Sequence, residues 1–152
     1  MRSFRACSVK HERGPFGGFA VGQGMPATLL HRLVTLGTIA LAVGLLGLAA
    51  HATLDPLGAS AVYGVPVDAA GAPWVTASGL RDGVLGLAAL VVLRHRAALP
   101  AFLACALLLP LSDVALSVLH GSGPLAAAPH ATGAVGIAVL LGLALVERRR
   151  AG

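Results

Sequence analysis

The sequence contains an uncharged apolar run that is long enough to cross a lipid bilayer. From Leu33 to Ala50 it holds 18 residues without a charged side chain, and its flanks extend the apolar stretch over residues 28–52. An α-helix rises about 1.5 Å per residue, so about 20 residues cross the roughly 30 Å of hydrocarbon in a membrane. We therefore predict a transmembrane helix over residues 28–52.

A secretory signal peptide is the alternative interpretation of this first segment. Arg32 would be its basic flank, and Ala50-His51-Ala52 would be an A-x-A cleavage site. The apolar run is longer than the usual signal-peptide core of about 7–15 residues, and further apolar segments follow it. A first membrane span is therefore favoured over a cleaved leader.

Three more segments have the same character, over residues 74–93, 97–119 and 130–146. The link between the second and third spans is so short that these two helices must form an antiparallel hairpin. Hydrophobic residues make up 57 % of the chain and charged residues only 11 %, against about 25 % charged residues in soluble domains. We predict an all-α, four-helix transmembrane bundle over residues 25–152, which is a polytopic membrane protein.

The first 24 residues differ from the rest of the chain. Residues 1–24 are rich in glycine and basic side chains, and they show no apolar periodicity. We expect a disordered basic cytoplasmic tail. Met25 is a second plausible start, so a misassigned start site is the alternative.

The positive charges flank the spans and fall on one predicted side of the membrane. Of the eleven Lys and Arg residues, only Arg81 lies deep within a span; the others precede the uncharged run that begins at Leu33, join the second span to the third, or follow the fourth. The positive-inside rule then places both termini in the cytoplasm of a multi-pass cell-membrane protein. Nucleic-acid binding is excluded as the reason for the basic charge, because these cations flank bilayer-spanning segments and do not form one solvated face.

Three charged residues stand where a bilayer makes charge costly. Arg81, Asp82 and Asp113 lie within the second and third predicted spans, where each charge costs roughly 2.5–3.5 kcal/mol on insertion. Arg81 and Asp113 are about equally deep in an antiparallel hairpin. We therefore expect a bidentate ion pair between Arg81 and Asp113, with Asp82 lining the same cavity.

Other polar residues extend this group toward the outer face. Ser78 precedes Asp82 by one helical turn, while Ser117 and His120 continue the face of Asp113. His130 opens the fourth span, and we expect the inner half to carry only flanking cations. We predict catalytic roles for Arg81, Asp82, Asp113 and His130, and ligand-binding roles for Ser78, Ser117, His120 and Trp74. The spacing of Gly79, Gly83 and Gly86 predicts close helix packing.

Three stretches carry a resemblance to a known family. They are GLRDGVLGLAALVVLRHR, LLLPLSDVALSVLHG and PHATGAVGIAVLLGLAL, in that order. They resemble an uncharacterised family of small four-helix integral membrane proteins, a domain of unknown function with a G-x-R-D motif, a buried Asp and a His that opens the last span. The resemblance covers about residues 30–148 and implies the bundle and the polar cluster, with Arg81, Asp82, Asp113 and His130 at motif positions. It implies no activity, and the tail before Met25 departs from the family.

Three functions fit these features. An enzyme could use the two carboxylates as acid and base, to open an epoxide or isomerise a lipophilic substrate; soluble epoxide hydrolases of the limonene type have a similar Asp-Arg-Asp site on another fold. A binding or transport protein could take up a proton or cation at Asp82 or Asp113. An accessory protein could use the cluster only as a staple between helices.

The expected partners are the lipid bilayer and a small lipophilic ligand, with a homo-oligomer left open. We expect no cofactor. We also expect no metal site, because Cys7 and Cys105 form no metal-binding motif.

The topology can be tested with reporter fusions after residues 60, 95, 125 and 150. They should read outside, inside, outside and inside, because the basic flanks stay in the cytoplasm. An external C-terminus would contradict this arrangement.

Overall fold

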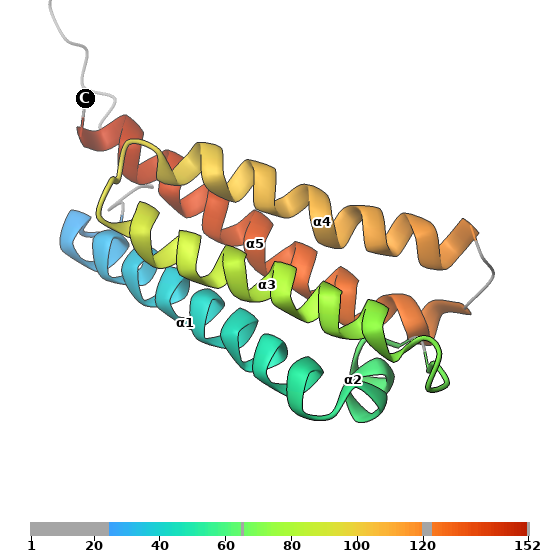
Figure 1. The fold of residues 1–152 in the computed structure, drawn as a ribbon. Coiled ribbons are helices and arrows are strands. Elements are labelled where there is room, and N and C mark those ends of the chain that lie inside the picture. Colours follow the sequence, from blue (N-terminus) through green and yellow to red (C-terminus); the bar gives the residue numbers. More distant parts are fainter. Residues whose placement is uncertain (1–24, 65, 120–122, 152) are drawn as a thin grey trace, which may run out of the picture.

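A computed structural model describes residues 25–64, 66–119 and 123–151. These residues form five helices and no strand: α1 (Ala27–Leu54), α2 (Pro56–Val62), α3 (Ala72–Leu93), α4 (Leu99–Leu119) and α5 (Gly123–Ala151) (Figure 1). All but α2 are long and apolar enough to span a membrane. The predicted all-α bundle with four membrane spans is confirmed, while the predicted tail lies outside the described residues.

The last helix is longer than the sequence indicated. α5 begins at Gly123, whereas the predicted span began at residue 130. The residues before His130 were placed outside the predicted span, but Pro124 is the second residue of the helix, where its missing N–H leaves no bond unmade. Pro129 is accommodated inside the same helix.

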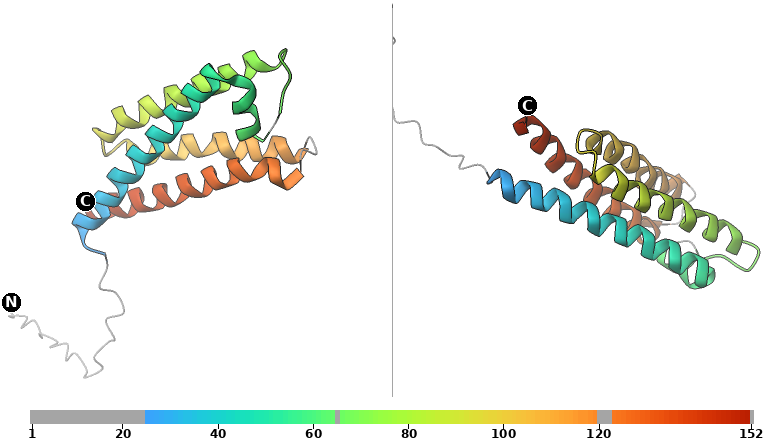
Figure 2. Two further views of the ribbon diagram at one scale, coloured as in Figure 1. Left: turned by 90° about the horizontal axis from the view of Figure 1, so that it is seen from below. Right: turned by 60° about the vertical axis from the view of Figure 1, so that its left-hand side comes forward.

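The bundle consists of two closely packed helix pairs. α1 packs mainly against α3, and α4 packs mainly against α5, while few contacts join α3 to α4 (Figure 2). The two ends of the bundle also differ. At one end, here called the basic end, α1 begins, α3 connects to α4 and α5 finishes; α2 lies at the opposite end, here called the far end (Figure 1).

Glycines on α3 allow its close approach to α1. A Cβ added at Gly79 would collide with the side chain of Ala52. One at Gly83 would lie 2.9 Å from Cβ of Ala49. The predicted packing role of these glycines is therefore confirmed, and it turns the face of α3 that carries Asp82 toward the bundle interior.

The short helix α2 is fixed at both ends by local interactions. The backbone N–H of Gly58 donates to the side chain of Asp55 at 2.9 Å, and Pro56 is the first residue of the helix. The helix stops at Tyr63, and Gly64 then adopts a φ of +74°, a conformation that glycine reaches without strain. This turn brings Tyr63 against the bundle.

Gly83→Leu tests the packing of α3 on α1. We expect the free energy of unfolding to fall by about 1–3 kcal/mol because the added side chain overpacks the contact with Ala49. Detergent-solubilised protein can be followed by thermal or denaturant unfolding. Gly47→Leu is the matched control, since a Cβ at Gly47 meets nothing within 4 Å. Equal stability of the two variants would contradict the packing role.

Candidate functional site

The guanidinium of Arg81 lies between two carboxylates. Its Nε and Nη2 donate to Oδ1 of Asp82 at 3.2 and 3.1 Å, and Nη2 also lies 3.7 Å from Oδ2 of Asp113. The predicted contact between Arg81 and Asp113 is present. It is a single, longer contact and not bidentate, because the arginine side chain turns toward its own neighbour in sequence.

Asp82 has both carboxylate oxygens occupied by donors. The residue is 7 % exposed, and its Oδ2 accepts a hydrogen bond at 3.0 Å from the hydroxyl of Tyr63. Burial, and next the negative charge of Asp82, raise the pKa of Tyr63 above its usual value, so the hydroxyl remains protonated and donates. Arg81 and Tyr63 together keep the Asp82 carboxylate in one position.

Sequence reasoning missed Tyr63 as part of the site. It is the only tyrosine in the chain, but it lies between the first and second predicted spans and outside both of them. Only the short α2, folded against α3, brings its hydroxyl to Asp82.

His130 on α5 completes the cluster. Its Nε2 lies 3.0 Å from the backbone carbonyl oxygen of Tyr63, and its Nδ1 lies 3.5 Å from Oδ2 of Asp113. A carbonyl oxygen only accepts hydrogen bonds, so Nε2 must carry a proton. The imidazole and phenol rings of these two residues also stack, with centroids 6.4 Å apart. Nδ1 is thus the nitrogen that His130 presents to Asp113.

Two cavities meet at this cluster. The first, here called the vestibule, has about 340 Å³ and is bordered by Trp74, Ser78 and Ser117 in addition to the cluster. The second, here called the chamber, has about 300 Å³ and lies among α1, α3, α4 and α5. Tyr63, Arg81, Asp113 and His130 border both, whereas Asp82 borders only the chamber.

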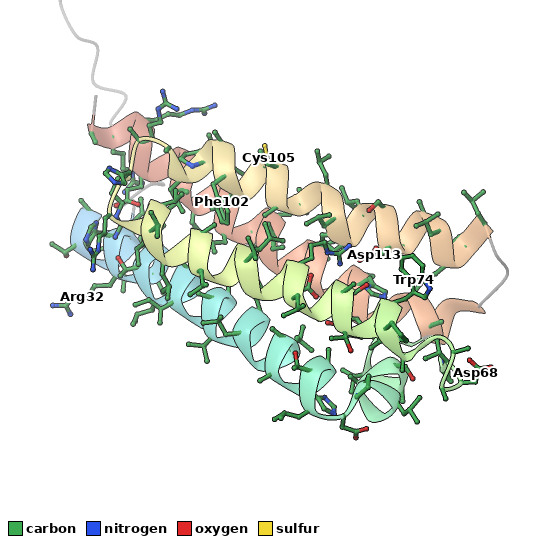
Figure 3. All side chains as sticks on the ribbon, in the orientation of Figure 1. Arg32, Asp68, Trp74, Phe102, Cys105 and Asp113 are labelled. Carbon is green, nitrogen blue, oxygen red and sulfur yellow. The ribbon has the colours of Figure 1, made fainter. Side chains whose placement is uncertain are left out.

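The structure therefore brings together most of the residues singled out from the sequence. Figure 3 shows Asp113 and Trp74 in the same half of the bundle, far from Arg32. The side chain of Trp74 borders the vestibule and is largely exposed, and Ser117 donates its hydroxyl to the backbone carbonyl of Asp113 at 2.8 Å. His120 lies outside the described residues.

A second polar cluster lies at the basic end, which was expected to hold only flanking cations; that expectation was wrong. Glu147 on α5 accepts from His31 on α1 at 2.7 Å and from Arg96 in the α3–α4 connection at 3.3 Å. Arg96 also donates to the hydroxyl of Thr35. The sequence signal was Glu147 itself, an acid that directly precedes three arginines.

The buried polar side chains among the described residues are all hydrogen-bonded, and these residues form no group suited to bind a metal ion. Among the residues that the structure describes, each buried side-chain nitrogen or oxygen has a hydrogen-bond partner. In the same ranges, no group of three or more His, Cys, Asp or Glu side chains is arranged to hold a metal ion. The far-end cluster offers two carboxylates, an imidazole, a phenol and a guanidinium.

Comparison with known proteins identifies a family for this arrangement. No curated protein and no solved structure gives a match. Residues 33–145 match a family described as a domain of unknown function, DUF4267. The matched range contains most of each of the four membrane helices and every residue of the far-end cluster. This multi-pass membrane protein therefore belongs to the DUF4267 family.

Proposed function

We propose that the protein is a membrane-embedded enzyme that performs acid–base chemistry on a lipophilic substrate, without a cofactor. The reaction is the addition of water to an epoxide or the isomerisation of a double bond. The observation that carries the proposal is the Asp82–Arg81–Asp113 arrangement at the junction of two cavities. A site of this kind offers charged groups to a substrate in an otherwise apolar space.

The two carboxylates have different surroundings and, in this proposal, different roles. Asp82 is buried and receives hydrogen bonds on both oxygens, so it positions Arg81. The side chain of Asp113 is 25 % exposed and borders both cavities, and its contacts with described residues are long, at 3.5 Å to His130 and 3.7 Å to Arg81. Asp113 is therefore the carboxylate that exchanges protons with substrate or water.

His130 is the natural partner of Asp113 in a proton transfer. When His130 carries protons on both nitrogens and Asp113 is ionised, the pair contains one acid and one base. Asp113 removes a proton from water as the water oxygen bonds to an epoxide carbon, and Nδ1 of His130 protonates the epoxide oxygen as its bond to that carbon breaks. The proton on Asp113 then returns to Nδ1, which restores the pair.

The same groups support isomerisation. Asp113 removes a proton from one carbon of the substrate, and His130 delivers a proton to another carbon of the shifted double bond. Arg81 lies beside the reacting position and favours negative charge that develops there.

The charge pattern supports one orientation in the cell membrane. Six arginines lie at the basic end of the described bundle: Arg32, Arg94, Arg96, Arg148, Arg149 and Arg150. With this end in the cytoplasm, both termini are cytoplasmic and the far-end cluster lies in the outer half of the membrane. Water then reaches the vestibule from outside, and the substrate reaches the chamber from lipid.

A second candidate function is a structural staple in an accessory protein. It is favoured by the position of Arg81, which contacts Asp113 across the sparsely packed seam between α3 and α4. In that case the ion pairs serve only to join the two helix pairs.

Asp113→Asn tests the proposed chemistry. With the protein in lipid nanodiscs and terminal 1,2-epoxyalkanes as substrates, we expect diol formation to fall about 100-fold or more, because the amide cannot accept the proton. His130→Gln should have a similar effect, and products can be quantified by gas chromatography. Asp68→Asn is the matched control, since Asp68 lies in the loop before α3 and only accepts from the N–H groups of Ala70 and Gly71. Full activity of Asp113→Asn would contradict the mechanism.

Unfolding measurements separate the enzyme from the staple. For a catalytic Asp113, we expect Asp113→Asn to change stability by about 1 kcal/mol or less, which is roughly 2–4 °C in melting temperature. A staple predicts an unstable Asp113→Asn and Arg81→Met, and stability close to that of the parent only when all three charges are removed together, as in Arg81→Met/Asp82→Asn/Asp113→Leu. That staple pattern would overturn the proposed enzyme.

A further inference from the structure

The chamber is polar at one end and apolar along the rest of its wall. Its polar lining residues all belong to the cluster: Tyr63, Arg81, Asp82, Asp113 and His130. Its other lining residues are hydrophobic side chains, prolines and glycines from all four membrane helices and the end of α2. An occupant must therefore have a small polar group at one end and hydrocarbon elsewhere.

The direction of the chamber follows from the helix register. On α5 its lining runs from His130 through Gly133 to Ile137, and on α4 it runs from Asp113 to Phe102, in both cases toward the basic end. At 1.5 Å per residue, the step from His130 to Ile137 is about 10 Å. The hydrocarbon part of an occupant thus extends from the cluster toward the middle of the bundle.

The volume of the chamber limits the size of this hydrocarbon. A water molecule occupies about 30 Å³ in the liquid, and a dry apolar cavity of about 150 Å³ accommodates benzene. The 300 Å³ of the chamber therefore corresponds to about ten non-hydrogen atoms.

Two glycines keep this space open. Gly44 on α1 and Gly133 on α5 line the chamber, and a Cβ at either would meet nothing within 4 Å. They differ from Gly83 and Gly86 on α3, where an added Cβ would come within 2.9 Å of α1 atoms. Helix packing does not require glycine at 44 or 133, so the free volume is what these two residues contribute.

We infer that the substrate is a hydrocarbon of about ten carbon atoms with an epoxide at one end, and that Gly44 and Gly133 set its length. The inference rests on the proposed function, because the cluster is taken as the reacting end. The epoxide lies against Asp113 and His130 at the polar end of the chamber, and the chain fills the chamber along Gly133 and Gly44.

Binding of a homologous series tests the inference. The probes are terminal 1,2-epoxyalkanes with 6 to 16 carbon atoms, and the Asp113→Asn protein in nanodiscs is used so that the probes are not consumed. After equilibrium dialysis the probe is extracted from the nanodiscs and its amount is measured. The amount retained by nanodiscs without protein is subtracted. We expect retention to be greatest near ten carbons, and Gly133→Leu to move this maximum to chains shorter by about four carbons, the size of the added side chain.

Matched substitutions outside the chamber serve as controls. Gly47→Leu on α1 and Gly142→Leu on α5 also place a Cβ in open space, but neither residue lines the chamber. They should leave the maximum near ten carbons. Gly44→Leu should move the retention maximum to shorter chains, so the test does not depend on whether Gly133→Leu folds.

Failure of this inference differs from failure of the proposed function. Retention that is independent of chain length, or an unchanged maximum in folded Gly133→Leu and Gly44→Leu, would overturn the chamber as the binding site. A clear retention maximum that shifts in these variants supports the chamber as the binding site, even if the parent protein converts no epoxide. The absence of epoxide conversion would instead contradict the proposed chemistry.

Discussion

The arrangement of the far end depends on the balance of charge around Arg81. A single guanidinium in an apolar bundle would be costly, and two neighbouring carboxylates would repel each other. Contacts of Arg81 with Asp82 at 3.1 Å and Asp113 at 3.7 Å relieve both costs. Because Asp82 belongs to α3 and Asp113 to α4, this balance also relates the two helix pairs where their packing is sparse. The cavities lie on either side of that junction.

The membrane helices could be predicted because hydrocarbon imposes a simple rule on sequence. A spanning helix satisfies its own backbone, so length and the absence of charge suffice to locate it. Gly79, Gly83 and Gly86 could be assigned to packing for a similar reason, since their spacing places them on one face. The start of α5 could not be located, because proline is compatible both with a linker and with the first turns of a helix.

The candidate site was only partly predictable. Depth in the bilayer correctly brought Arg81 and Asp113 together, but it could not decide which carboxylate the flexible arginine side chain would prefer. Tyr63 and the group formed by His31, Arg96 and Glu147 depend on how a short helix and a connection fold back on the bundle. Helix periodicity tells which residues share a face of one helix. It does not tell how a short helix or a connection packs against another helix. The roles of Arg81, Asp82, Asp113 and His130 remain predictions.

The turn at Gly64 has a consequence for His130 on the other side of the site. The carbonyl group of Tyr63 that receives Nε2–H is a permanent dipole of the backbone, held by the positive φ of the next residue. Unlike a carboxylate in the same position, it neither gains nor loses a proton over the biological pH range. The group that orients the imidazole ring through Nε2 therefore keeps the same charge at every such pH, and Nδ1 is held facing Asp113.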